Sequence, residues 1–312
     1  MADNLTRPMA KPPVRPSLSH TVKERVLAWA FIVPAFIVVF ALILMPIVRA
    51  FWMSLHTIDL KRPALGQPFI GLENYVDILQ DGFFWASIQR TGYFMVASIA
   101  VELVLGVAVA LLLNQEFKGR GILRTLILIP WALPITIDAI MWKWIFNANY
   151  GALNSLLLQL GLIQSYRAWL SKPFLALNMV MIADIWKVTP LVVLLTLASL
   201  QTSPPALYEA ALVDGANAWR RFWHITLPLL RPTLAMILVI RTMDAFKVFD
   251  IIYIMTSGGP SDATKVIAYF TYQEAFSFLR FGRGAALAYL MTFFIAIMAF
   301  FYIRLVSRET EY

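Results

Sequence analysis

Hydrophobic residues fill this chain in long runs, and polar residues gather between the runs. A helix that crosses a bilayer needs about 20 consecutive, mostly apolar residues. Six runs of that length occur, at residues 26–50, 93–113, 122–146, 174–200, 228–252 and 285–305. Prolines inside several runs predict kinks, which neighbouring helices accommodate. The pattern therefore predicts an all-α membrane protein, with one six-span transmembrane domain over residues 26–312.

The first 25 residues have a different character. They are rich in proline and basic residues and poor in apolar ones, which predicts a disordered basic tail. A cleaved signal peptide fits poorly, because the apolar run from Val26 to Ala50 exceeds the 7–15 residues of a signal-peptide core and offers no small-residue cleavage site.

Composition supports the membrane assignment and excludes other classes. Only 14% of the residues are charged and 60% are hydrophobic, whereas a soluble domain carries about 25% charged residues. The net charge of +8 does not indicate nucleic-acid binding, because Lys and Arg flank the apolar runs instead of forming one patch. They are more numerous on the face that holds both termini, which predicts that both termini are cytoplasmic. With no cysteine, disulfides and thiol chemistry are excluded.

The segment between the fourth and fifth runs, EAALVDGANAWRRFWHITLP (209–228), is too polar to cross a membrane. Ser203 before two prolines predicts a helix cap, and Gly215 predicts a break between two short amphipathic helices. Three uses of such a segment remain open on the pattern: docking a partner protein, resting on lipid headgroups, or a solvated connection. On the predicted topology it lies in the cytoplasm.

The spacing of this segment resembles a family signature. The segment contains EAA at 209–211, a glycine after three intervening residues at Gly215, and I-x-LP after nine further residues at 225–228. This spacing is similar to the motif of binding-protein-dependent ABC importer permeases. The resemblance implies a type I importer permease fold in a bacterial cytoplasmic (inner) membrane. It also implies a coupling helix at about residues 204–221 that docks on an ATPase subunit, with the contact residues Glu209, Ala210, Ala211, Asp214 and Gly215.

A second stretch, FDIIYIMTSGGPSDAT (249–264), resembles the sugar-uptake branch of the same permeases, in the first of its two permease subunits. FIGLENYVDIL (69–79) is similar to the first extracytoplasmic loop of that branch. The matching turn contains Thr256, Gly258, Gly259 and Pro260, which equally suit an ordinary helix exit. The chain lacks the extra N-terminal spans and large insertion of the maltose-type founder, so it resembles the short six-span members.

Charged residues inside the spans are the candidates for a solute pathway, since such residues normally face a cavity or a partner. Counting about 1.5 Å per residue along straight helices places Asp138, Asp184 and Asp244 at one depth, in the outer half of the membrane. The predicted pathway residues are Asp138, Trp142, Asp184, Trp186, Lys187, Asp244, Lys247 and Asp250. Lys143, Trp144 and Arg241 lie in the same spans.

Two interpretations of these residues remain open. In the first, Asp184 with Lys187, and Asp244 with Lys247, are i,i+3 pairs that neutralise each other on their own helices, and groups near the outer span ends reach water. Alternatively the charged groups contact solute, and the tryptophans stack on a sugar ring or form an aromatic belt. The balance of acids and bases suits a neutral polyol without excluding an anionic sugar derivative.

Together these features predict a non-catalytic permease subunit of an ATP-driven sugar importer. The resemblance implies four kinds of partner: a second permease, an ATPase dimer, an extracytoplasmic solute-binding protein, and membrane lipid. ATP and Mg would be bound by the ATPase, since the chain has no GxxxxGK[ST] loop, and neither a cofactor nor a metal is expected in this chain. The alternative is a stand-alone ion-coupled transporter, although the inverted repeats typical of that class are not evident. An enzyme is disfavoured, because the three histidines are scattered.

Overall fold

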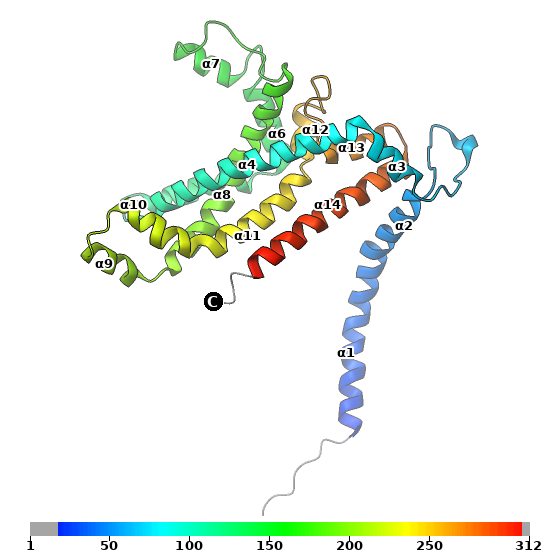
Figure 1. Cartoon of the computed structure of the whole chain (residues 1–312), viewed down its shortest axis with the longest axis horizontal. Helices are drawn as coiled ribbons and strands as arrows, with labels where there is room; N and C mark the ends of the chain where they lie inside the picture. Colours follow the sequence, from blue (N-terminus) through cyan, green and yellow to red (C-terminus); the bar gives the residue numbers. More distant parts are fainter. Residues whose placement is uncertain (1–17, 308–312) are drawn as a thin grey trace, which may run out of the picture. The chain divides into compact units, whose positions relative to one another are not determined.

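The computed structural model describes residues 18–307, which are built almost entirely of helices (Figure 1). The chain forms two compact units, residues 1–52 and 53–312. The described part of the first unit is a long apolar helix with a π-helical turn inside it: α1 (Leu18–Val39), η1 (Phe40–Leu44) and α2 (Met45–Ser54), whose last two residues belong to the second unit. The helix begins at Leu18, earlier than the predicted span, and most of the predicted disordered tail lies outside the described residues.

Four long helices form the body of the second unit: α4 (Gly82–Asn114), α8 (Pro173–Thr202), α11 (Leu227–Phe246) and α14 (Phe281–Ser307). α4 packs against α8 and α11, and α11 also packs against α8 and α14 (Figure 1). At Gly106 the backbone of α4 approaches α8 so closely that a Cβ atom would overlap Val192. Small residues allow such close approach of helices, which sustains van der Waals packing within a membrane.

The third predicted span is broken in two. α5 (Arg120–Ala132) and α6 (Ile135–Ile145) meet at 95°. Leu133 is extended, with φ −69° and ψ 138°, because the proline that follows disfavours helical backbone at the preceding residue. Five described helices are long and apolar enough to cross a membrane, and the bent pair makes a sixth. The predicted six spans are thus confirmed if the bent pair counts as one, but the straight helix used to place Asp138 is wrong.

Two other predicted boundaries are also wrong. α11 ends at Phe246, because the backbone leaves the helical region at Lys247 (φ −93°, ψ 9°), and Asp250 begins a separate short helix, α12 (Asp250–Met255). Ser203 does not cap the next helix: it ends α8, and Pro204 stands at the cap position of α9 (Pro205–Val213). The remaining short helices are η2 (Pro63–Leu65), α3 (Glu73–Gln80), α7 (Ala152–Gln159), α10 (Ala218–Arg221), η3 (Phe222–Thr226), α13 (Ile267–Tyr272) and η4 (Gln273–Ser277).

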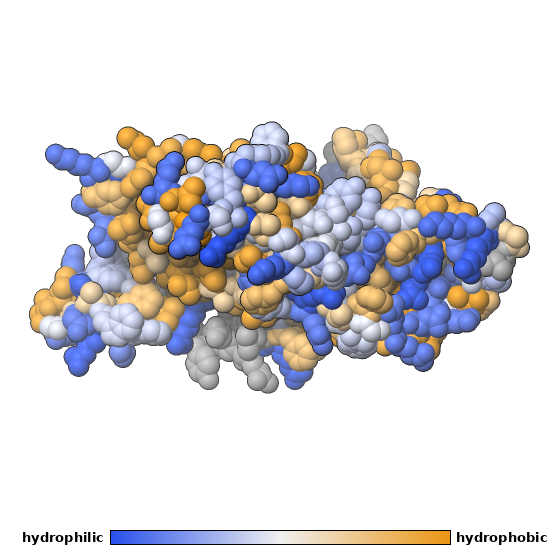
Figure 2. All heavy atoms as spheres, turned by 90° about the horizontal axis from the view of Figure 1, so that it is seen from above, coloured by the Kyte–Doolittle hydropathy of each residue, from blue (hydrophilic) through white to orange (hydrophobic). Residues whose placement is uncertain are grey.

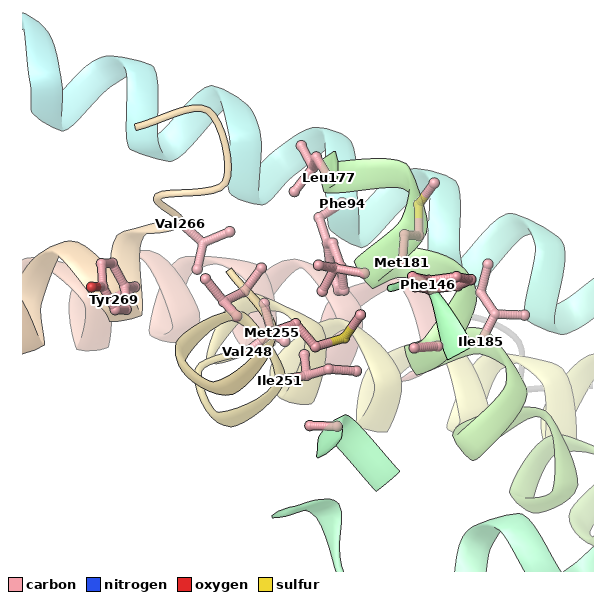
Figure 3. Close-up of a cluster of buried hydrophobic side chains, with 14 residues drawn as sticks. Phe94, Phe146, Leu177, Met181, Ile185, Val248, Ile251, Met255, Val266 and Tyr269 are labelled. Carbon is pink, nitrogen blue, oxygen red and sulfur yellow. The ribbon is translucent and has the colours of Figure 1, made fainter. Parts of the chain in front are cut away.

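The largest buried cluster joins α4, α6, α8 and α12 (Figure 3). Phe94, Leu177, Met181, Ile251 and Met255 meet there from helices far apart in sequence. This core fixes α12 and α6 against the long helices. Elsewhere, apolar side chains cover broad areas of the outer surface (Figure 2), as expected for helices that face lipid or other membrane-embedded chains.

Candidate functional site

The loop between α8 and α11 is an exposed helical protrusion with a glycine at its break. Glu209 and Ala210 of α9 are exposed, and Ala211 is half-buried. Gly215 has φ +73°. Its N–H bonds the Leu212 carbonyl (3.1 Å), and the Ala216 N–H bonds the Ala211 carbonyl (2.8 Å). These two bonds form a Schellman ending, which needs a left-handed residue at this position and so favours glycine.

The second half of the protrusion is held by its own contacts. Asn217 caps α10 by accepting from the Arg220 N–H (2.8 Å). The rings of Trp219 and Trp223 lie edge to face with centroids 5.7 Å apart, and the Tyr208 hydroxyl lies 3.2 Å from the Thr226 hydroxyl, which ties α9 to η3. The predicted pair of short helices separated at Gly215 is therefore confirmed, and it directly connects two long helices of the bundle.

A buried ionic cluster joins three of those long helices. Arg241 of α11 donates from Nε to Glu102 Oε2 (2.7 Å) and from Nη2 to Glu102 Oε1 (2.8 Å), a bidentate pair with α4. Its Nη2 also donates to Asp184 Oδ2 of α8 (3.1 Å). All three side chains are buried. We call Glu102, Asp184 and Arg241 the ionic triad; it fastens α4, α8 and α11 to one another.

The local pair of Asp184 with Lys187, one of the two interpretations left open by the sequence, does not form. Asp184 is neutralised by Arg241, and Lys187 Nζ instead donates to the carbonyl of Leu133. That carbonyl stands at the break between α5 and α6, where the helix supplies no partner for it. A lysine from a neighbouring helix therefore satisfies a backbone acceptor that would otherwise be unpaired in the membrane.

Glu102 is the residue that the sequence analysis missed. It stands in the second apolar run with no opposite charge within a helical turn, so no local pair draws attention to it. The absence of a nearby opposite charge could itself have drawn attention to Glu102, because a lone carboxylate within a span requires a partner from another helix.

The second predicted pair is present. Lys247 Nζ lies 3.3 Å from Asp244 Oδ1, and both side chains are about half exposed, at 55% and 51%. Asp250 follows in the first turn of α12 and is also exposed. These three charged residues therefore lie on an uncovered part of the second unit, at the end of α11 that is remote from the α9 protrusion.

Asp138 is fully buried in the first turn of α6, and neither carboxylate oxygen has a hydrogen-bond partner among the described residues. Trp142, one turn later, has a buried Nε1 that is equally without a partner. Its ring meets Trp186 of α8 edge to face at 5.6 Å. Both rings line a groove of about 760 Å³ between α4, α5 and α8, whose walls are otherwise nearly all apolar.

Lys143 and Trp144, which lie in the same span as Asp138 and Trp142, do not join the predicted pathway residues. Lys143 donates to the carbonyl of Ile254 (2.8 Å) and links α6 to α12, whereas Trp144 is exposed on the outside of α6. The structure thus separates the predicted set into an exposed group, which contains Asp244, Lys247 and Asp250, and a buried or half-buried group, which contains Asp138, Trp142, Asp184, Trp186 and Lys187.

The predicted glycine turn closes α12 through side-chain bonds. The Thr264 hydroxyl donates to the Gly259 carbonyl (2.7 Å) and lies 2.7 Å from the Thr256 hydroxyl. Gly258 has φ +82° and lies against the ring of Tyr269, and the Gly259–Pro260 bond is cis. Each of these contacts shapes the turn and positions the start of α13.

Comparison with known proteins gives one consistent picture. Residues 102–310 match the family described as binding-protein-dependent transport system inner membrane component. The trehalose/maltose transport system permease protein MalF of Thermococcus litoralis is 42% identical over 278 residues, which is 89% of this chain and 92% of that protein.

Two further relatives extend the picture. The sulfoquinovosyl glycerol transport system permease protein SmoG of Agrobacterium fabrum is 37% identical, over 92% of each chain. A chain in a crystal structure of a bacterial ABC transporter that imports the acidic polysaccharide alginate superposes with a TM-score of 0.81 at 25% identity, covering 94% of this chain and 99% of that one. The matched family, the length of the agreement and the exposed EAA–glycine protrusion all lead to one assignment: this chain belongs to the inner membrane permeases of binding-protein-dependent ABC transport systems.

Proposed function

We propose that this chain is a permease subunit of an ATP-driven importer for a sugar or sugar derivative. The observation that carries the proposal is the exposed α9 protrusion with its EAA–glycine sequence, in a chain similar over most of its length to trehalose/maltose and sulfoquinovosyl glycerol permeases. The chain forms half of a translocation pathway with a second permease. Each permease docks on one subunit of an ATPase dimer, which binds ATP and Mg, and an extracytoplasmic protein delivers the solute.

The docking surface is the exposed edge of α9. The small side chains of Ala210 and Ala211 permit close approach of a partner, and the exposed Glu209 carboxylate accepts hydrogen bonds from it. Asp214 and Gly215 set the direction in which the chain leaves the helix. On the charge distribution of the loops, this protrusion and both termini are cytoplasmic.

The mechanical consequence follows from chain connectivity. α9 is joined directly to α8 at one end and through α10 and η3 to α11 at the other. The ionic triad holds α8 and α11 together inside the membrane. A displacement of α9 by closure of the ATPase dimer therefore moves both helices as one body, and the pathway alternates between two arrangements.

The test is reconstitution of the complete importer in liposomes, with ATP inside and binding protein outside. We expect ATP-dependent accumulation of radiolabelled trehalose, maltose or a sulfosugar glycoside that needs this chain, the second permease, the ATPase and the binding protein together. Accumulation by this chain alone, driven by a proton or sodium gradient, would instead establish a secondary transporter.

Lys247→Ala is expected to lower the maximal uptake rate about tenfold, because a charged hydrogen bond contributes roughly 1.5–3 kcal/mol. Asp244 lies in the last turn of α11 and Lys247 follows that helix directly, and the pair is half exposed, so both groups are accessible to solute. Arg62→Ala is the matched control, since Arg62 forms an exposed i,i+3 pair with Asp59 outside the spans. Equal uptake by the two variants would indicate that Lys247 only neutralises Asp244.

A further inference from the structure

Five aromatic side chains gather beyond the end of α11, from the α11–α12 link, α12, α13 and η4. We call Phe249, Tyr253, Tyr269, Tyr272 and Phe276 the aromatic surface. Phe249 stands at its centre, with ring centroids 5.5 Å from Tyr253, 5.0 Å from Tyr272 and 6.3 Å from Tyr269. Tyr253 and Tyr272 are 5.4 Å apart, and Tyr272 and Phe276 are 5.3 Å apart.

One layer of this surface is buried and the other is uncovered. Tyr269 is 7% exposed and is seated on Gly258, which places it against the glycine turn. Tyr253 is 44% exposed and Phe276 is 60% exposed, whereas Phe249 and Tyr272 are half-buried. The turn and Tyr269 thus support the other rings, and Tyr253 and Phe276 are the most exposed of the five.

The surroundings of the aromatic surface are polar. Asp250 and Tyr253 are three residues apart on α12 and are both exposed, so they share one side of that helix. Lys247, paired with Asp244, lies just before them and is also exposed. Exposed charges of this kind do not face hydrocarbon. The side of α12 that bears Tyr253 therefore faces a polar environment and not hydrocarbon.

We propose that Phe249, Tyr253 and Tyr272 form a stacking platform for a pyranose ring, at the extracytoplasmic mouth of the pathway. A pyranose has an apolar C–H face that packs on an aromatic ring, and a rim of hydroxyls that form hydrogen bonds. The carboxylate of Asp250, the ammonium of Lys247 and the phenol of Tyr253 are the hydrogen-bonding groups near these rings. The platform lies at the end of α11 opposite the α9 protrusion, and it meets solute before the half-buried pair Trp142 and Trp186. This inference rests on the proposed function.

The experiment uses the complete importer in liposomes and measures ATP-dependent uptake of the sugar that the wild type transports, at saturating binding protein. We expect Tyr253→Ala and Tyr253→Leu each to lower the uptake rate at least fivefold, and Tyr253→Phe to stay within twofold of the wild type, because stacking needs the ring. Phe301→Ala, which removes an exposed ring from α14, is the matched control and is expected to have wild-type uptake.

The outcomes separate the two proposals. A wild-type importer that moves no sugar overturns the proposed function and the platform with it. A sugar-transporting wild type with normal uptake by Tyr253→Leu overturns the platform alone, because leucine preserves apolar packing without stacking. Loss of assembly with the ATPase by both Tyr253→Ala and Tyr253→Leu also overturns it, since the ring would then serve the fold.

Discussion

Replacing Arg241 with alanine is expected to destabilise the membrane-embedded bundle by about 3–5 kcal/mol, the usual cost of removing one partner from a buried ion pair. The guanidinium makes three hydrogen bonds to Glu102 and Asp184. Its removal leaves two buried carboxylates close together with no cation between them. Thermal unfolding of the purified importer in detergent measures the loss. Arg231→Ala, an exposed arginine on the same helix, is the matched control and is expected to unfold as the wild type does.

A triple replacement separates the cost of leaving two carboxylates unpaired from the cost of losing the ionic triad as a whole. Glu102→Leu, Asp184→Leu and Arg241→Met together remove every charge of the ionic triad, and apolar replacement of a whole buried cluster is commonly neutral or stabilising. We therefore expect the triple variant to unfold near the unfolding temperature of the wild type, and well above the unfolding temperature of Arg241→Ala. If Arg241→Ala alone unfolds like the wild type, the carboxylates have another source of compensation and the role assigned to the triad is wrong.

Gly215→Val is expected to abolish coupled uptake, lowering it more than tenfold, while leaving the membrane bundle folded. Gly215 has φ +73°, and a Cβ atom there would meet no neighbour within 4 Å. The cost is therefore backbone strain, about 1–2 kcal/mol for a left-handed residue with a side chain. That strain is relieved most easily by unwinding the end of α9, which misplaces the Glu209 edge. Uptake and ATP hydrolysis are measured together on the reconstituted importer.

The matched control for this prediction is Gly119→Val. Gly119 has φ +91° and equally open surroundings, in the loop between α4 and α5. The same strain is thus introduced in a loop that is not part of the docking surface, and near-normal uptake is expected. Equal loss in both variants would mean that loop strain anywhere disables the transporter, and normal uptake by Gly215→Val would remove the docking role of this turn.

Features that depend on neighbours in sequence were predicted well. The apolar runs are long enough to specify the spans. The glycine between two short helices is dictated locally, since the Schellman bonds all lie within residues 211–216. The Asp244–Lys247 pair is likewise one helical turn long. Docking by Glu209 and its neighbours, and contact of the pathway residues with solute, stay predictions.

Features that depend on distant residues were not predictable. Asp184 had a plausible local partner in Lys187, but its carboxylate pairs with Arg241, 57 positions away. Glu102 and Arg241 are 139 positions apart. The bend at Leu133 carries a local signal in Pro134, yet its 95° angle is realised because Lys187 from another helix satisfies the freed carbonyl.

The order of residues alone thus specified six apolar spans and a polar protrusion of two short helices, because hydropathy, helix endings and i,i+3 pairs act over a few residues. The packing of α4, α8 and α11 decided which charges neutralise each other inside the membrane. The packing of α12, α13 and η4 decided which aromatic rings share one surface. The physical reason is that a buried charge is compensated by whatever group the fold brings within about 3 Å, and separation along the chain carries no information about that distance.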